Sequence, residues 1–130
     1  YWKSWDAWVK AQLLSRGWIS PEDPAIYYIA ETPADAARHI VRFYRNYHSS
    51  RYVRDDLVIR LQRPLNPDDI ARLADEFRVL IRPGGAMSLR GPMDGESDHA
   101  DLSRLVFPHT RHKFGLIRTL IDRINDLEPL

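Results

Sequence analysis

The sequence contains no cysteine, which excludes disulfide bonds, thiolate nucleophiles and cysteine-ligated zinc or iron–sulfur sites. Lysine is also scarce: only three of the 19 basic residues are lysines, so 19 − 3 = 16 are arginines. The longest apolar run, residues 25–30, is far shorter than the ~20 residues of a membrane-spanning helix. The formal net charge of +1 gives no overall field that would draw the chain to nucleic acid or an anionic membrane. We therefore expect a cytoplasmic protein with no membrane partner and no nucleic-acid partner.

The first third of the chain is predicted to form a helix, a strand and a second helix. The first helix spans residues 4–16, with Ser4 as its N-cap and Gly17 just after its end. Residues 25–29 are apolar in succession, as in a parallel strand buried on both faces. Thr32 caps the second helix. The buried side of that helix is expected to contain Ala36, Ala37, Ile40, Val41, Tyr44 and Tyr47. This order of elements is typical of a layered α/β domain.

The remainder of the chain has a different pattern. Apolar residues alternate along residues 57–61, which predicts a strand with one core face and a solvent face that includes Val58 and Arg60. Asn66 caps a helix, and Thr110 caps the last helix. Further strands are predicted at residues 79–81, 87–89 and 102–107. The order β-α-β-β-α indicates a small α+β unit of the ferredoxin-like or ACT type.

The chain is therefore predicted to contain two units, residues 1–48 and residues 49–130. The polar link His48-Ser49-Ser50-Arg51 marks the boundary between them. With 130 residues, of which 44% are hydrophobic and 28% charged, the chain is long enough for one globular domain, or one and a fraction.

The segment Pro83-Gly84-Gly85 is the nearest match to a phosphate-binding loop, because consecutive glycines can bring backbone N–H groups close to an anion. It does not continue as GxGxxG or GxxxxGK. A glycine turn between two strands explains it fully.

An acidic segment could supply oxygen ligands to a hard cation. Its members are Asp94, Glu96, Asp98, His99 and Asp101. The spacing lacks the glycine and the terminal glutamate of a calcium loop, so a solvated acidic loop is the better interpretation. We expect no metal and no cofactor.

An arginine-rich stretch with interleaved aromatic residues lies between residues 38 and 63. Its arginines are Arg38, Arg42, Arg45, Arg51, Arg54, Arg60 and Arg63. Such interleaving could suit single-stranded nucleic acid or a phosphorylated ligand. The first three arginines share one helix face, however, so a polar helix face or a subunit interface is the better interpretation.

The start of the last helix carries His109, Arg111, His112 and Lys113. Free backbone N–H groups at a helix start favour anions, so these four residues are the best candidates for a ligand-binding site. Pairing of these residues with the acidic loop at residues 94–101 is nevertheless the better interpretation. None of the patterns in the sequence is a catalytic constellation, and we assign no catalytic residue.

Three short stretches resemble the carboxyl-terminal end of the LONELY GUY (LOG) family, long labelled possible lysine decarboxylases. They are Tyr1-Trp2-Lys3-Ser4-Trp5, Gly17-Trp18-Ile19-Ser20-Pro21 and Ile29-Ala30-Glu31-Thr32-Pro33-Ala34-Asp35-Ala36. The following residues 42–61 look like the extended bacterial members, which carry an extra α+β unit after the Rossmann-like domain.

The resemblance implies a Rossmann-like homodimer that hydrolyses the N-glycosidic bond of nucleoside 5′-monophosphates, giving free base and ribose 5-phosphate. The family's PGGxGTxxE motif holds the phosphate and supplies a glutamate for cleavage. Here Pro83-Gly84-Gly85-Ala86-Met87-Ser88 lacks the Gly-Thr and the glutamate, so the motif is expected before Tyr1. Trp5, Trp8, Val9 and Ile26 are then expected to be uncovered in this chain, because they would pack on strands that precede it. A non-catalytic regulatory or dimerisation module that binds a small anion is the alternative.

Overall fold

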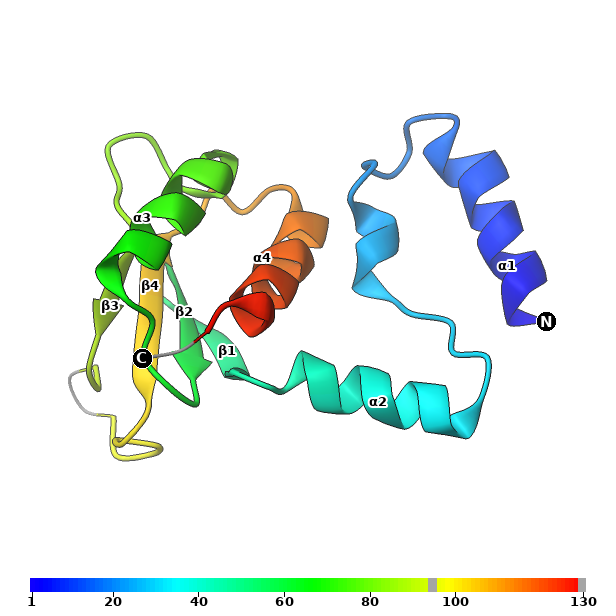
Figure 1. The fold of residues 1–130 in the computed structure, drawn as a ribbon. Coiled ribbons are helices and arrows are strands. Elements are labelled where there is room, and N and C mark those ends of the chain that lie inside the picture. Colours follow the sequence, from blue (N-terminus) through cyan, green and yellow to red (C-terminus); the bar gives the residue numbers. More distant parts are fainter. Residues whose placement is uncertain (94–95, 129–130) are drawn as a thin grey trace.

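The computed structural model describes residues 1–93 and 96–128, which form a small α+β domain with four α-helices and a four-stranded antiparallel sheet (Figure 1). The elements are α1 (Trp2–Val9), the π-helical turn η1 (Lys10–Leu14), the 3₁₀ turn η2 (Asp23–Ile26), α2 (Pro33–Phe43), β1 (Tyr47–Val53), β2 (Asp56–Leu61), α3 (Pro67–Glu76), the 3₁₀ turn η3 (Arg78–Leu80), β3 (Ser88–Arg90), β4 (Ser103–Pro108) and α4 (Phe114–Asp126).

The sheet has the strand order β1-β2-β4-β3, and every neighbouring pair is antiparallel. Helices α3 and α4 cover one face of it (Figure 1). The core between these layers contains Leu57, Ile59, Leu61, Leu65, Leu73, Phe77, Leu80, Met87, Leu105, Phe107, Leu120 and Ile124. The alternation predicted for 57–61 is thus confirmed on its core side. On the other side the predicted solvent face is wrong: Val58 is fully buried, and the Arg60 side chain is only 11% exposed in an ion pair with Glu96.

Local capping explains where two of the helices start. The Thr32 hydroxyl accepts a hydrogen bond from the Asp35 amide at 3.1 Å, and the Asn66 side chain accepts one from the Asp69 amide at 2.7 Å. Both starts are confirmed. The last helix begins later than expected: its N-cap is Lys113, with no side-chain cap, so Thr110 does not cap it.

The first helix differs from the prediction at both ends, although Gly17 follows it as expected. It begins at Trp2, not at Ser4, and widens into a π-helical turn after Val9. Gly17 follows it in the left-handed conformation with φ +69°, which only glycine adopts without strain. Val9 is buried, contrary to expectation.

Three strand predictions need correction. Residues 25–29 form no strand: η2 ends at Ile26, Tyr27 is extended, and no strand of the described chain pairs with this segment. Residues 78–80 form a 3₁₀ turn, and Ile81 makes a single bridge to His109. The polar residues 48–51, expected as a link, lie inside β1, because residues 49–51 pair with β2 in antiparallel register after an irregularity at His48. The strand predicted at 102–107 is confirmed as β4.

The face of α2 that was expected to be buried is largely uncovered. Ile40 is 57% exposed and Val41 is 73% exposed. We refer to the described residues 45–93 and 96–128 as the body. α2 meets the body at the carboxyl end of the helix, where Arg42 pairs with Asp126 of α4 at 2.9 Å. Figure 1 shows α1 at the far end of the molecule from the sheet, so residues 1–44 form an arm, and we use that name for them below.

Candidate functional site

The four predicted anion-site residues lie in the connection between β4 and α4 and at its end. His109 is fully buried, and its Nδ1 lies 2.6 Å from the Tyr52 hydroxyl. Burial lowers the pKa of His109, so its imidazole is uncharged at neutral pH. The Arg111 guanidinium lies 3.9 Å from the centre of the Tyr52 ring and donates to the Arg54 carbonyl at 2.8 Å. The structure thus brings His109 and Arg111 together around one tyrosine, as a packed cluster.

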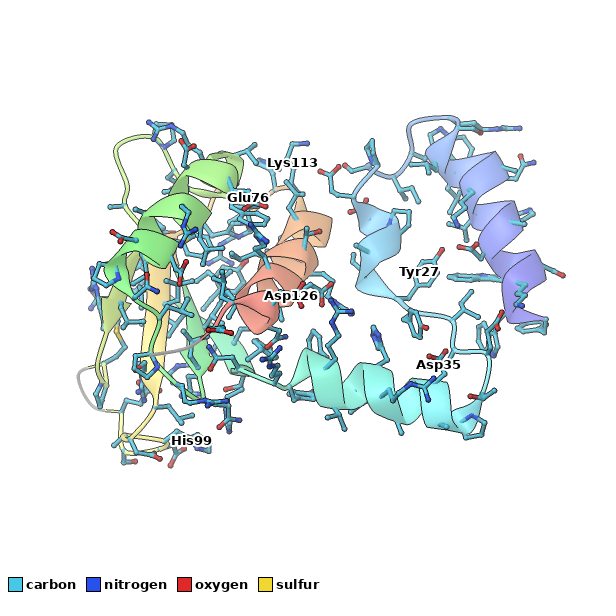
Figure 2. All side chains as sticks on the ribbon, viewed as in Figure 1. Tyr27, Asp35, Glu76, His99, Lys113 and Asp126 are labelled. Atoms are coloured by element: carbon cyan, nitrogen blue, oxygen red, sulfur yellow. The ribbon has the colours of Figure 1, made fainter. Side chains whose placement is uncertain are left out.

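Lys113 turns away from that cluster. Its Nζ lies 3.0 Å from Glu22 Oε1, and it extends from the start of α4 toward the segment before η2 (Figure 2). The hydrogen bond from Lys113 holds the pKa of Glu22 below its usual value. A Cβ on Gly115 would lie 2.4 Å from the Glu22 carbonyl oxygen, so the backbone of Glu22 packs directly on the first turn of α4.

The expected pairing of this basic segment with the acidic loop at 94–101 is therefore wrong for the residues that the structure describes. Glu22 neutralises Lys113, and a backbone carbonyl accepts from Arg111. The reason is tertiary: η2 packs on α4, and the acidic loop lies over the sheet face away from the helices. Asp94 lies outside the described residues.

The arginine-rich stretch does not form one surface. On α2, Arg38 pairs with Asp35 and Arg42 with Asp126, which is the polar helix face that the spacing predicts. On the sheet, Arg51 and Arg60 turn to Glu96 instead.

Glu96 is the centre of an ion-pair cluster that the sequence does not indicate. Its carboxylate Oε1 lies 3.1 Å from Arg60 Nε and 3.0 Å from Arg51 Nη2. Its Oε2 accepts from Arg104 Nε at 2.9 Å and from the Met93 amide at 3.1 Å. Burial alone would raise the pKa of Glu96, but hydrogen bonds from Arg60 and Arg104 outweigh burial and lower the pKa to about 2. We refer to Arg51, Arg60, Arg104 and Glu96 as the Glu96 cluster.

No sequence spacing could have revealed this cluster. Arg60 and Arg104 are direct partners in the register of β2 and β4, and that register is a property of the folded sheet. The acidic loop was interpreted as solvated, and for Glu96 this is wrong, because its side chain is only 2% exposed. Within the described part of the chain, no three histidine or carboxylate side chains converge closely enough to hold a metal ion.

The glycine segment is a turn, as predicted. The Gly85 amide donates to the Arg82 carbonyl at 2.9 Å, and Gly84 has φ +78° after Pro83. A hollow of about 630 Å³ lies between this turn and α3. Its lining mixes small apolar side chains with Asp75, Arg78 and Arg82.

The arm carries the most extensive uncovered apolar surface. Trp2 is 60% exposed, and Trp5, Trp8 and Ile26 are also exposed, as expected. A hollow of about 440 Å³ lies between Trp2, Trp5 and the extended residues 27–30. Among the hydrogen bonds of the described chain, none involves the backbone of residues 28–30. This segment is neither helix nor strand, and its backbone groups are available to pair with a strand.

No family model, curated protein or solved structure matches the chain. Over residues 1–93 and 96–128, no helix has both the length and the apolar character that a bilayer crossing requires.

Proposed function

We propose that this chain is the carboxyl-terminal part of a LOG-like nucleoside 5′-monophosphate phosphoribohydrolase. In this proposal the arm (residues 1–44) completes a Rossmann-like catalytic domain, with residues 27–30 as a strand of the parallel sheet of that domain. The sheet-bearing part of the chain is a non-catalytic ferredoxin-like or ACT-type accessory unit. The whole enzyme is a cytoplasmic homo-oligomer, and its substrate is a nucleoside monophosphate.

The single observation that carries this proposal is the extended segment in the arm. Residues 28–30 are apolar and make no backbone hydrogen bonds within the described chain, so their backbone groups are available to another strand. Helices precede and follow this segment, and both leave aromatic or aliphatic side chains uncovered. A helix–strand–helix unit has these properties when the neighbouring strand of its sheet belongs to another part of the protein.

The proposed reaction comes from the resemblance to the LOG family, which implies hydrolysis of an N-glycosidic bond. In glycosidic cleavage a carboxylate beside the ribose stabilises an oxocarbenium-like transition state. The carboxylate best protected from water here, Glu96, is neutralised by three guanidinium groups and belongs to the accessory unit. The proposal therefore assigns the reaction to the Rossmann-like catalytic domain that the arm completes. The role of the arm itself is structural.

A direct test compares the 130-residue chain with the complete product of its gene. We expect the complete product to release ribose 5-phosphate from AMP, and the 130-residue chain to release none above a heat-inactivated control. The reading frame before Tyr1 should encode a PGGxGTxxE motif. Turnover by the short chain, or a complete product without this motif, would contradict the proposal.

Amide hydrogen exchange tests whether residues 28–30 pair with a strand of the catalytic domain, independently of the enzymatic reaction. The amides of residues 28–30 should exchange freely in the 130-residue chain and be protected in the complete product, because strand pairing would supply their acceptors. The amides of β2 provide the matched control, since they are paired in this chain and should be protected in both proteins. Equal exchange of residues 28–30 in both proteins would refute the proposed strand pairing.

A further inference from the structure

The Glu96 cluster concentrates positive charge around one carboxylate. Three guanidinium groups, from Arg51, Arg60 and Arg104, contact the Glu96 carboxylate, and the Met93 amide adds a fourth donor group. Each guanidinium can bind a carboxylate or a phosphate through parallel N–H donors. The donors around Glu96 therefore have the composition of an oxyanion-binding site.

The arginines are held in place by more than Glu96. Arg60 and Arg104 lie side by side on the two central strands, in the antiparallel register of β2 and β4. Arg60 Nη1 also donates to the Ser49 hydroxyl at 3.3 Å, and Arg104 Nη2 donates to the His99 carbonyl at 2.9 Å. The donors are thus positioned before any ligand arrives, which lowers the entropic cost of binding one.

The carboxylate is held differently from its donors. Glu96 lies in the connection between β3 and β4, where described residues 91–93 and 96–102 form neither helix nor strand. Arg51 projects from the edge strand β1 and its side chain is 42% exposed, whereas that of Arg104 is fully buried. The site therefore has a buried floor and a rim that solvent reaches.

We propose that Arg51, Arg60 and Arg104 form an oxyanion-binding site on the sheet face away from α3 and α4, and that Glu96 is its internal ligand. A small molecule that carries a carboxylate or a phosphate group competes with Glu96 for this site. The site is separate from the arm and from residues 109–113, so the proposal does not depend on the proposed enzymatic function.

Chemical rescue tests the proposal. The Glu96→Ala variant removes the internal ligand and leaves the donors in place. Its melting temperature should rise by at least about 3 °C in ~50 mM acetate or phosphate relative to chloride at matched ionic strength, because an anion that binds only the folded state stabilises it. Comparison of the rise in acetate with the rise in phosphate shows which oxyanion the site prefers. In the wild type the same anions should produce a smaller rise, because Glu96 competes.

Two double variants locate the effect. Adding Arg60→Ala to Glu96→Ala should abolish the rise. Adding Arg78→Ala should preserve it, because Arg78 is exposed on η3, which packs with the helices and not on this sheet face. A rise that survives Arg60→Ala, or that chloride reproduces, would overturn the proposal.

A spectroscopic measurement covers the case in which Glu96→Ala fails to fold. Phosphate titrated into the wild-type protein should shift the Nε–Hε resonances of Arg60 and Arg104, whereas that of Arg78 should stay unchanged. The same titration of Glu96→Gln, which keeps the side-chain volume, should reach half-saturation at a lower phosphate concentration. Unchanged Arg60 and Arg104 resonances in the wild type would refute the proposal that an anion competes with Glu96 for these arginines.

Discussion

Replacing Asn125 with alanine should destabilise the fold, because this side chain holds α4 to the chain between α2 and β1. Asn125 is 1% exposed. Its Oδ1 accepts from the Asn46 amide at 2.8 Å and from the Tyr47 amide at 2.9 Å, and its Nδ2 donates to the Phe43 carbonyl at 2.5 Å. Asn125→Ala removes all three bonds and leaves a small cavity.

The expected loss follows from those contacts. A buried polar group without a partner costs about 1–3 kcal/mol, and the Asn46 amide is the most deeply buried of the three. We therefore expect a loss of about 3–5 kcal/mol, a large part of the ~5–15 kcal/mol that stabilises a typical domain. In a urea titration followed by far-ultraviolet circular dichroism, this loss lowers the midpoint by about 2 M.

Two further variants make the test specific. Asn125→Asp keeps the oxygen that accepts from both amides, but it places a buried carboxylate oxygen against the Phe43 carbonyl, so it should destabilise the fold at least as much as the alanine variant. Asp126→Ala removes the exposed ion pair with Arg42 on the same helix and should cost only about 0–1 kcal/mol. If Asn125→Ala costs no more than Asp126→Ala, water satisfies the two amides and the reasoning is refuted.

Three other predictions concern the body. The pKa of Glu96, about 2, lies below its unfolded value, so its contribution of about 1–3 kcal/mol is present above about pH 4.5 and is lost as pH falls toward 2; acid unfolding of Glu96→Gln should lack this loss. The pKa of His109 is lowered, so the unfolded chain binds the proton more tightly; stability should fall as pH drops below ~6.5, and urea midpoints of His109→Asn should not show this fall. Gly115→Ala should lower the melting temperature although alanine favours helices by about 1 kcal/mol, because its Cβ would meet the Glu22 carbonyl; a higher melting temperature would show that η2 does not pack there.

Local chemistry in the sequence correctly predicts several elements. Thr32 and Asn66 cap helices through bonds to amides three residues ahead, and these bonds need no other part of the fold. The left-handed Gly17 and the turn at Gly84 are equally local. The apolar alternation of 57–61 identifies β2 and its core face, because a strand presents alternate residues to the same side.

The errors arise where an element depends on a distant partner. Residues 25–29 have the composition of a buried strand, but a strand exists only where another strand supplies its hydrogen bonds, and none does so among residues 1–93 and 96–128. The polar residues 48–51 have no strand-like apolar pattern, yet they pair along β2 and become β1. Thr110 has the composition of a cap, but the α4 helix starts after a left-handed Lys113 that pairs with Glu22.

The sequence by itself therefore determined the helix starts of α2 and α3 and the glycine turns, because each depends on neighbours within a few residues. Its apolar pattern also located β2 and β4, although the pairing of these two strands is tertiary. Only the tertiary structure decided the partners of the charged groups. Arg60 meets Arg104 through sheet register, both meet Glu96 through the path of the β3–β4 connection, and Lys113 meets Glu22 across 91 residues. Electrostatic pairing depends on distance in space, and the spacing of charges along the chain does not encode that distance.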